Sequence, residues 1–235
     1  VQIYTASENR LALQELLPEA IISCYDSYDD SQLSHLLDWA DVVCIGCGLG
    51  MGQISEKILK NVLKNVSCPC VIDADGLNLL SRNIELLNQC CAPVILTPHM
   101  KEMSRLTGWS IDTIMEDRFQ ALDQIIKQSG PDTKSSIICV LKDSRTVVAQ
   151  TNRQRFVNLA GNNSMAKGGS GDVLAGTIAG LLAQHMAPFE ATTVGVFLHA
   201  CGGDEAKKSK GSYSVLARDL IQGMADAMKN AKECR

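Results

Sequence analysis

The sequence lacks several features that mark particular classes of protein. Its 235 residues contain no apolar run long enough to cross a bilayer and no recognisable signal peptide. They also contain no long block of lysine and arginine, and the formal net charge is −4. We therefore expect neither a nucleic-acid partner nor a membrane partner for this chain.

A complete zinc-binding pattern is also missing, although the chain has ten cysteines. Cys44-x-x-Cys47 and Cys68-x-Cys70 each resemble half of a zinc site, but neither has a convincing second pair or a histidine partner. Cys44, Cys70 and Cys139 lie inside apolar runs, which favours reduced thiols that fill a core. We expect no metal at these cysteines and a location in the reducing cytoplasm.

The chain length and the alternation of patterns predict one α/β domain over residues 1–235. Strands are expected at 1–4, 21–24, 41–45, 70–73, 93–97 and 136–141, with a hairpin at 146–158. Helices are expected at 8–16, 31–38, 54–63, 110–128, 187–207 and 215–232, and from residue 172 onward. Strands separated by helices favour a largely parallel sheet with helices on both faces. Because the chain opens on Val1 in a strand, we interpret it as an N-terminally incomplete domain or a processed product.

The glycine-rich stretch at 158–182 is the most informative part of the sequence. Its glycines and Ser170 precede apolar residues at helical spacing, so the run Gly168-Gly-Ser-Gly171 is expected at a helix N-terminus. Free backbone N–H groups and the positive end of the helix dipole bind phosphate or a developing negative charge there. Asp172 follows directly, and it either caps the helix or acts as a general base that takes a proton from an attacking hydroxyl.

Polar or glycine-rich clusters follow four of the expected strands. They are Gly46–Gly50, Asp73–Asn78, Thr97–Glu102 and Lys142–Thr146. Each has a structural alternative, such as a tight turn or a helix cap. A parallel sheet presents the carboxyl ends of its strands along one edge, so we expect the clusters to converge with Gly168–Asp172 in one site.

These motifs together resemble one family. Gly161-Asn-Asn-Ser-Met-Ala-Lys-Gly-Gly-Ser-Gly-Asp-Val-Leu174 is similar to the signature of the ADP/ATP-dependent NAD(P)H-hydrate dehydratases, which belong to the ribokinase-like superfamily. Four further motifs occur in the family's order: Ile45–Gly50, Val71–Asn78, Leu96–Leu106, and Val140–Lys142 with Thr146. The resemblance implies a ribokinase-like fold whose N-terminal strand and glycine-rich loop have no counterpart before Val1.

The resemblance also implies a repair reaction and a set of site residues. NADH or NADPH hydrated on the nicotinamide ring is phosphorylated by ATP or ADP at the new hydroxyl, and phosphate then leaves to restore the double bond. Asp172 is the implied base, Gly168, Gly169, Ser170 and Gly171 are the implied anion hole, and Gly50, His99, Asn162 and Asp172 are the implied contacts to the hydrated dinucleotide. Lys142, Asp143, Ser144, Arg145, Thr146 and Gly171 are implied for the adenine nucleotide, and Glu102 for Mg²⁺ through water. The family also implies a homotetramer, and which nucleotide donates the phosphoryl group stays open.

The chain departs from the family pattern at several positions. Cys47 stands where the family usually has proline, Asn163-Ser164 and Met100-Lys101 where it has Pro-Gly, and Lys167 where it has threonine. Asp143 replaces a glycine, and an acidic side chain there repels nucleotide phosphates unless it points outward. Two alternatives stay open: a ribokinase-like small-molecule kinase that stops at the phosphorylated product, and a catalytically silent nucleotide-binding subunit.

Overall fold

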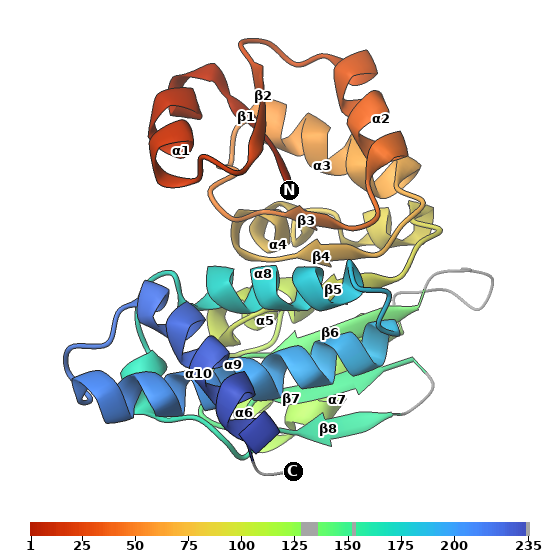
Figure 1. The fold of residues 1–235 in the computed structure, drawn as a ribbon. Coiled ribbons are helices and arrows are strands. Elements are labelled where there is room, and N and C mark those ends of the chain that lie inside the picture. The colour runs from red at the N-terminus through yellow and green to blue at the C-terminus, as the bar shows by residue number, and fades with distance from the viewer. Residues whose placement is uncertain (128–135, 152–153, 234–235) are drawn as a thin grey trace.

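A six-stranded sheet forms the centre of the computed structural model, which describes residues 1–127, 136–151 and 154–233 (Figure 1). Its strands lie side by side in the order of the sequence, from β3 to β8. The first four are parallel, and β6, β7 and β8 pair antiparallel. The strands are β3 (Val43–Ile45), β4 (Cys70–Ile72), β5 (Val94–Leu96), β6 (Ile137–Leu141), β7 (Val147–Gln150) and β8 (Arg155–Val157). The predicted largely parallel sheet and the hairpin are confirmed, except that residues 152 and 153 of the hairpin lie outside the described residues.

The central strands are apolar on both sides because helices cover both faces of the sheet. In β4, Cys70 and Ile72 pack into one hydrophobic cluster, whereas Val71 between them packs into the other. The same alternation holds in β5 and β6. Cys70 and Cys139 are fully buried, as predicted.

Cys44 is not a core residue, and the prediction that it fills the core is wrong. It lies on β3, which is the edge strand of the sheet, and it is exposed. Its partner in the register is Val71, whose side chain faces α8 (Ser170–Leu182). An edge strand has no further strand beside it, so a residue on this side of β3 is left only partly covered.

The first layer of helices packs on the face that carries Cys70 and Ile72. It contains α2 (Asp30–Trp39), α3 (Gln53–Asn65), α4 (Ala74–Leu80), η2 (Ile84–Gln89), α5 (Met100–Thr107), α6 (Ile111–Glu116) and α7 (Arg118–Ile126). The single surface helix predicted over 110–128, whose last residue lies outside the described residues, is wrong. The helix α6 ends at Glu116, and the side chain of Asp117 caps a new helix by accepting from Gln120 N–H at 2.9 Å. Ile114 and Leu122 of this pair are fully buried.

The second layer covers the opposite face and carries the glycine-rich stretch. It contains α8, α9 (Pro188–Lys210) and α10 (Ala217–Glu233), and α10 packs on α9 (Figure 1). Leu174 and Ile178 of α8 pack against Val71 and Ile95 of the sheet. This packing fixes the N-terminus of α8 beside the carboxyl ends of the strands.

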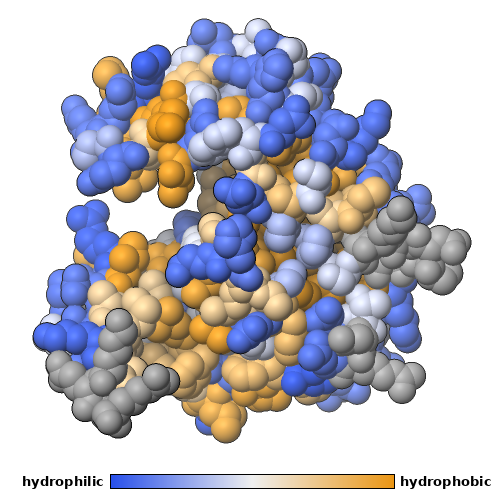
Figure 2. Space-filling view, turned by 45° about the vertical axis from the view of Figure 1, so that its right-hand side comes forward, coloured by the Kyte–Doolittle hydropathy of each residue, from blue (hydrophilic) through white to orange (hydrophobic). Residues whose placement is uncertain are grey.

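The N-terminal part forms a separate parallel pair, β1 (Gln2–Ala6) with β2 (Ile21–Tyr25), joined by η1 (Ser7–Asn9) and α1 (Arg10–Leu16). No residue of α1 is buried. Figure 2 shows the molecule hollowed on one side, between the part that contains the N-terminus and the part below it. No helix in the described ranges has both the length and the apolar character needed to span a membrane.

Candidate active site

The N-terminus of α8 lies at the centre of the predicted site. Gly169 precedes the helix in a left-handed conformation with φ of 85°, which glycine adopts without strain, and the helix begins at Ser170. The N–H of Ser170 donates to the carbonyl of Lys167 at 3.3 Å. Within the described ranges no carbonyl accepts from the N–H groups of Gly171 and Asp172. Two backbone donors are therefore available to an anion at the positive end of the helix dipole.

The carboxylate of Asp172 projects from the first turn of this helix. Its side chain is exposed, and in the described part of the chain it accepts no hydrogen bond from a backbone N–H. The residue in the cap position is Gly169, and no side chain caps the helix. The alternative in which Asp172 serves as the cap is therefore wrong, and its carboxylate is available to side-chain partners.

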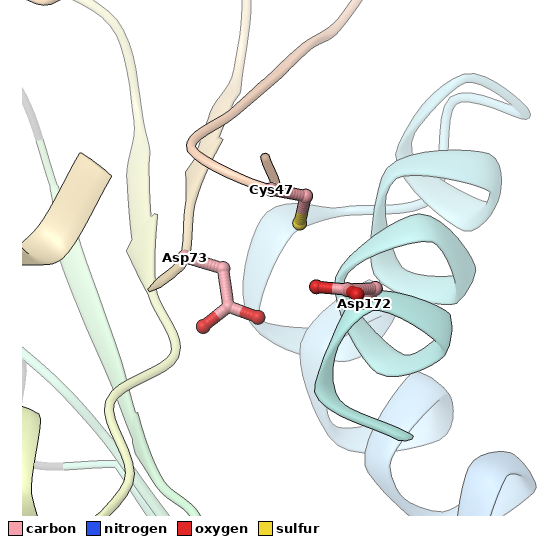
Figure 3. Close-up of side chains that lie close together, drawn as sticks. All are labelled: Cys47, Asp73 and Asp172. Carbon is pink, nitrogen blue, oxygen red and sulfur yellow. The ribbon is translucent and has the colours of Figure 1, made fainter. Parts of the chain in front are cut away.

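Three side chains from three elements point toward one another beside α8 (Figure 3). Cys47 comes from the loop after β3, Asp73 from the end of β4, and Asp172 from α8. The Cys47 sulfur and one oxygen of each carboxylate all lie within 4.8 Å of one another. Asp73 is 1% exposed, whereas Cys47 and Asp172 are open to solvent.

The surroundings of the Cys47 thiol raise its pKa. A hydrogen bond with Cys44, burial of the sulfur and a hydrogen bond to the Asp172 carboxylate all raise the pKa of Cys47. The same contact with Cys47 lowers the pKa of Cys44, because a neighbouring S–H stabilises the Cys44 thiolate. Cys44 and Cys47 therefore form a close pair of thiols next to the carboxylate of Asp172.

Lys142, which follows β6, joins the strand ends to α8. Its Nζ lies 2.6 Å from Oδ1 of Asp73 and 3.9 Å from Oε2 of Glu102. A side chain at Gly171 would place its Cβ 3.1 Å from this Nζ and 3.4 Å from Oδ2 of Asp73. The absence of a side chain at Gly171 thus lets the helix terminus approach the ion pair.

His99 and Glu102 form a capping box at the start of α5. Nδ1 of His99 accepts from the N–H groups of Lys101 and Glu102 at 3.1 and 3.3 Å, and Glu102 Oε2 accepts from the His99 N–H at 2.8 Å. Because Nδ1 accepts, the proton of the neutral ring is on Nε2. Burial and then the charge of Lys142 lower the pKa of His99. Burial raises the pKa of Glu102, and the hydrogen bond from the His99 N–H opposes that shift.

The glycine-rich loop after β3 is held against α4. Gly46 has φ of 121°, and a Cβ there would lie 1.9 Å from the carbonyl oxygen of Asp73, so only glycine fits. The N–H of Gly50 donates to Oδ2 of Asp75 at 2.9 Å. This contact brings Gly50, a predicted substrate residue, beside the Asp73–Asn78 cluster.

The turn at 143–146 follows Lys142 directly. Asp143 pairs with Arg118 of α7 at 2.8 Å, so its charge is neutralised by a neighbouring helix. Arg145 Nη1 donates to the carbonyl of Leu159 at 3.0 Å, and Thr146 Oγ1 donates to the carbonyl of Asp143 at 3.2 Å. Ser144 is exposed.

Asn162 forms hydrogen bonds within the loop before α8 and to α9. Its amide nitrogen donates to Oδ1 of Asp204 at 2.8 Å, and its oxygen accepts from the N–H of Ser164 at 3.0 Å. The N–H of Gly161 donates to the other oxygen of Asp204 at 3.1 Å. These bonds fasten the loop before α8 to α9 and leave no side-chain oxygen of Asn162 without a partner.

The structure thus brings Gly171, Asp172, Lys142, His99 and Glu102 together, with Gly50 next to them. Two members of the site had not been assigned a role from the sequence: Asp73 and Cys47. Asp73 carries a signal, since a carboxylate directly after a buried strand is expected at the sheet edge. The sequence gives only a weak signal for Cys47, which is its position inside the glycine-rich loop after β3.

Comparison with known proteins gives a consistent result. A family model described as NAD(P)H-hydrate dehydratase matches residues 1–225. The bifunctional NAD(P)H-hydrate repair enzyme Nnr of Moorella thermoacetica is 37% identical over 193 residues, which are 82% of this chain and 35% of that protein. The ADP-dependent (S)-NAD(P)H-hydrate dehydratase of Neisseria meningitidis is 35% identical over 222 residues, which are 92% of this chain and 73% of that protein. The chain thus spans about a third of the bifunctional relative.

Among solved structures, the ADP/ATP-dependent NAD(P)H-hydrate dehydratase from Bacillus subtilis, co-crystallized with ATP/Mg²⁺, superposes with a TM-score of 0.79. The match covers 97% of this chain and 78% of that one at 27% identity. The ribokinase-like arrangement predicted from the motifs is confirmed by this likeness and by that to a ribokinase-like superfamily protein from Enterococcus faecalis, with a TM-score of 0.76 and 32% identity over 97% of this chain and 76% of that one.

Proposed function

Because the chain belongs to the NAD(P)H-hydrate dehydratase family, we propose that it converts hydrated NADH or NADPH to the intact dinucleotide at the expense of ATP or ADP. The observation that carries the proposal is the exposed Asp172 carboxylate, which has no backbone partner in the described residues and stands beside two free backbone N–H groups. A base and an anion site thus occur side by side at one helix terminus.

In the first step the hydroxyl of the hydrated ring attacks the terminal phosphorus of the nucleotide. Asp172 accepts the hydroxyl proton, the new O–P bond forms, and the bond to the shortened nucleotide breaks. The N–H groups of Gly171 and Asp172 stabilise negative charge on the transferred phosphoryl group. Of the four residues proposed for the anion hole, Gly171 fits best, because the N–H of Ser170 is already bonded to Lys167.

In the second step phosphate leaves from the ring carbon. The ring nitrogen's lone pair expels it, and loss of a proton from the neighbouring carbon restores the double bond. Phosphate is a much better leaving group than hydroxide, so the first step makes the second one possible. Lys142, which lies 2.6 Å from Asp73 and against Gly171, adds positive charge where the phosphoryl group is transferred.

His99 and Gly50 are proposed as contacts to the hydrated dinucleotide. The Nε2–H of neutral His99 is a donor, and the side chain is about half exposed. His99 follows β5 and Gly50 follows β3, the strands on either side of β4, which Asp73 follows. Residues 143–146 are proposed for the adenine nucleotide, since the turn follows Lys142 directly.

Mg²⁺ is proposed as the companion of the nucleotide, whose phosphate charges it screens when bound. Glu102 is only 5% exposed, and both of its oxygens approach His99, at 2.8 and 3.4 Å. It therefore fits a link to the ion through water and does not fit direct coordination. Most ligands of the ion would then come from the phosphates and water.

A homotetramer and a cytoplasmic location are further proposals. Val194 and Phe197 of α9 are 37% and 53% exposed, and an interface on that helix would bury them. All nine cysteines of the described residues are free thiols, which supports a reducing compartment.

The test is an assay of hydrated NADH and hydrated NADPH with Mg²⁺ and either ATP or ADP. Recovery of reduced-nicotinamide absorbance that depends on one of the nucleotides supports the dehydratase and identifies the phosphoryl donor. A stable phosphorylated product without recovery would instead support a kinase. Nucleotide binding without consumption would support the silent subunit.

A further inference from the structure

The group formed by Cys47, Asp73 and Asp172 has the composition of a metal site. One sulfur and two carboxylate oxygens lie within 4.8 Å of one another and point into a common space (Figure 3). The Cys44 thiol adjoins that of Cys47 and adds a second sulfur nearby. The sequence alone argues against zinc at Cys44-x-x-Cys47 because no second cysteine pair follows. In the fold, the carboxylates of Asp73 and Asp172 lie beside Cys47 and could take the place of a second pair of cysteine ligands.

Asp73 gives the group a fixed anchor. The residue is 1% exposed, and Lys142 occupies Oδ1 at 2.6 Å. Within the described ranges Oδ2 accepts no hydrogen bond, and one of the two oxygens points toward Asp172 (Figure 3). A bound cation would contact Oδ2, because Lys142 already holds Oδ1.

The distances are compatible with a small divalent ion. Zinc binds sulfur at about 2.3 Å and carboxylate oxygen at about 2.0–2.2 Å, so its ligand atoms must lie within about 4 Å of one another, and the three atoms here are already within 4.8 Å. Cys47 and Asp172 are exposed and can rotate inward, whereas Asp73 is held in place by Lys142. Three protein ligands leave the fourth position to water or to Cys44.

The charges also balance. Asp73 and Asp172 contribute two negative charges and Lys142 one positive charge, so the group carries about −1 before a metal enters. Binding of a divalent cation by the Cys47 sulfur releases the thiol proton to solvent and brings the sum to about zero. The choice of ion follows from the sulfur, since thiolate selects zinc-like ions over Mg²⁺, which requires oxygen ligands in an octahedron.

We propose that Cys47, Asp73 and Asp172 form a binding site for a thiophilic divalent cation of the zinc class, and that the ion inhibits the enzyme by occupying Asp172. The inhibition rests on the proposed function, because there Asp172 is the base. A metal ion on this carboxylate prevents it from accepting a proton and fills the place of the substrate hydroxyl. The ion therefore competes with the hydrated dinucleotide.

Direct binding is measured first, without nucleotide or substrate. The metal-free protein, kept reduced with a phosphine that does not bind metals strongly, is titrated with Cd²⁺ while the ultraviolet charge-transfer absorption of cadmium–thiolate bonds is recorded. Competition with Zn²⁺ then gives the zinc affinity. We expect one ion per chain, and an affinity reduced by about tenfold or more in Cys47→Ser and in Asp172→Asn.

The matched control is Cys91→Ser, which removes another exposed cysteine and should bind as the unmodified protein does. Both cysteine positions are exposed, so these variants should fold. Equal cadmium absorption and equal zinc affinity in Cys47→Ser and Cys91→Ser would overturn the site. Binding that needs Cys47 but is unaffected by Asp172→Asn would overturn the inhibitory role.

Inhibition is then measured at free Zn²⁺ concentrations set by a metal buffer, with each variant compared with its own rate without zinc. We expect zinc to raise the KM for hydrated NADH in the unmodified protein and in Cys91→Ser, and to have little effect on Cys47→Ser. Metal binding without dehydratase activity would contradict the proposed function alone. Dehydratase activity with no metal binding would contradict the metal site alone.

Discussion

The Nζ of Lys142 lies 2.6 Å from Oδ1 of Asp73, and the two residues follow β6 and β4, the strands on either side of β5. The side chain of Asp73 is only 2% exposed, and that of Lys142 is 18% exposed. Gly171 at the start of α8 approaches both groups. The start of the helix that carries Asp172 therefore lies against this ion pair of the sheet.

Loss of this lysine should destabilise the fold. Lys142→Met leaves the buried Asp73 carboxylate without its cation, which should lower the free energy of unfolding by about 3 kcal/mol. Urea unfolding followed by circular dichroism measures the change. The double variant Lys142→Met/Asp73→Asn should recover part of the loss, because the buried charge is gone, and a double variant less stable than the single one would contradict this account.

Gly171→Ala should impair activity more than stability. The new Cβ would lie 3.1 Å from Lys142 Nζ and would push apart the ion pair and the helix terminus. Gly168→Ala is the control, since a Cβ at Gly168 meets nothing within 4 Å. We expect a large fall in kcat for Gly171→Ala and a small one for Gly168→Ala, and similar kinetics for both would count against the contact.

The glycines after β3 should differ in their tolerance of a side chain. Both Gly46 and Gly48 have positive φ, but a Cβ at Gly46 would lie 1.9 Å from the Asp73 carbonyl, whereas Gly48 faces open space. Gly48→Ala should lower the free energy of unfolding by about 1 kcal/mol through backbone strain alone. Gly46→Ala should cost considerably more, and equal losses in thermal unfolding would show that the close approach is absent.

The protein should lose stability as the pH falls through the range set by His199. Burial lowers the pKa of this histidine from 6.5 to about 4, and its side chain lies 3.4 Å from Ser170. Folding therefore favours the neutral ring. The resulting stability is fully present above pH 6.5 and is lost as the pH falls toward 4, by up to about 3 kcal/mol.

Urea unfolding at several pH values measures this slope. His199→Gln should reduce the slope between pH 7 and pH 4 without abolishing it, because burial lowers the pKa of His99 as well. An unchanged slope in the variant would rule out His199 as its source.

The pair formed by Arg118 and Asp143 should protect nucleotide binding. Arg118→Ala removes the cation that lies 2.8 Å from Asp143 and leaves a negative charge in the proposed nucleotide turn. The Kd for ATP or ADP should rise several-fold, and Arg118→Ala/Asp143→Asn should restore it. If the double variant binds as weakly as Arg118→Ala, repulsion by Asp143 is not the cause.

Much of the fold was predictable because its signals are local. Apolar runs such as 70–72 and 137–141 indicated buried parallel strands, and their carboxyl ends indicated where the site lies. The break between α6 and α7 was missed because apolar periodicity continues through it and the cap at Asp117 is a single side chain. The exposure of Cys44 depends on which strand lies at the edge, and an apolar run does not give the strand order.

The sequence predicted which loops form the site, but it did not predict which side chains within the site contact one another. The glycine-rich and polar clusters that follow the expected strands predicted that Asp172, His99 and Lys142 lie together at one edge of the sheet. Two contacts of the site join residues more than 60 positions apart: Lys142 with Asp73, and Cys47 with Asp172. The spacing of residues along the chain does not predict contacts of this kind. Asn162 lies in a matching motif, but its hydrogen bonds with Asp204 and Ser164 are visible only in the fold.

The most direct test of the central claim is recovery of reduced-nicotinamide absorbance from hydrated NADH by Asp172→Asn. Asp112→Asn is the matched control, because Asp112 is also an exposed carboxylate in the first turn of a helix, α6. We predict that Asp172→Asn loses about 10²-fold or more in kcat while still binding nucleotide, and that Asp112→Asn keeps its rate. Equal rates in Asp172→Asn and in the unmodified protein would contradict the assignment of Asp172 as the base.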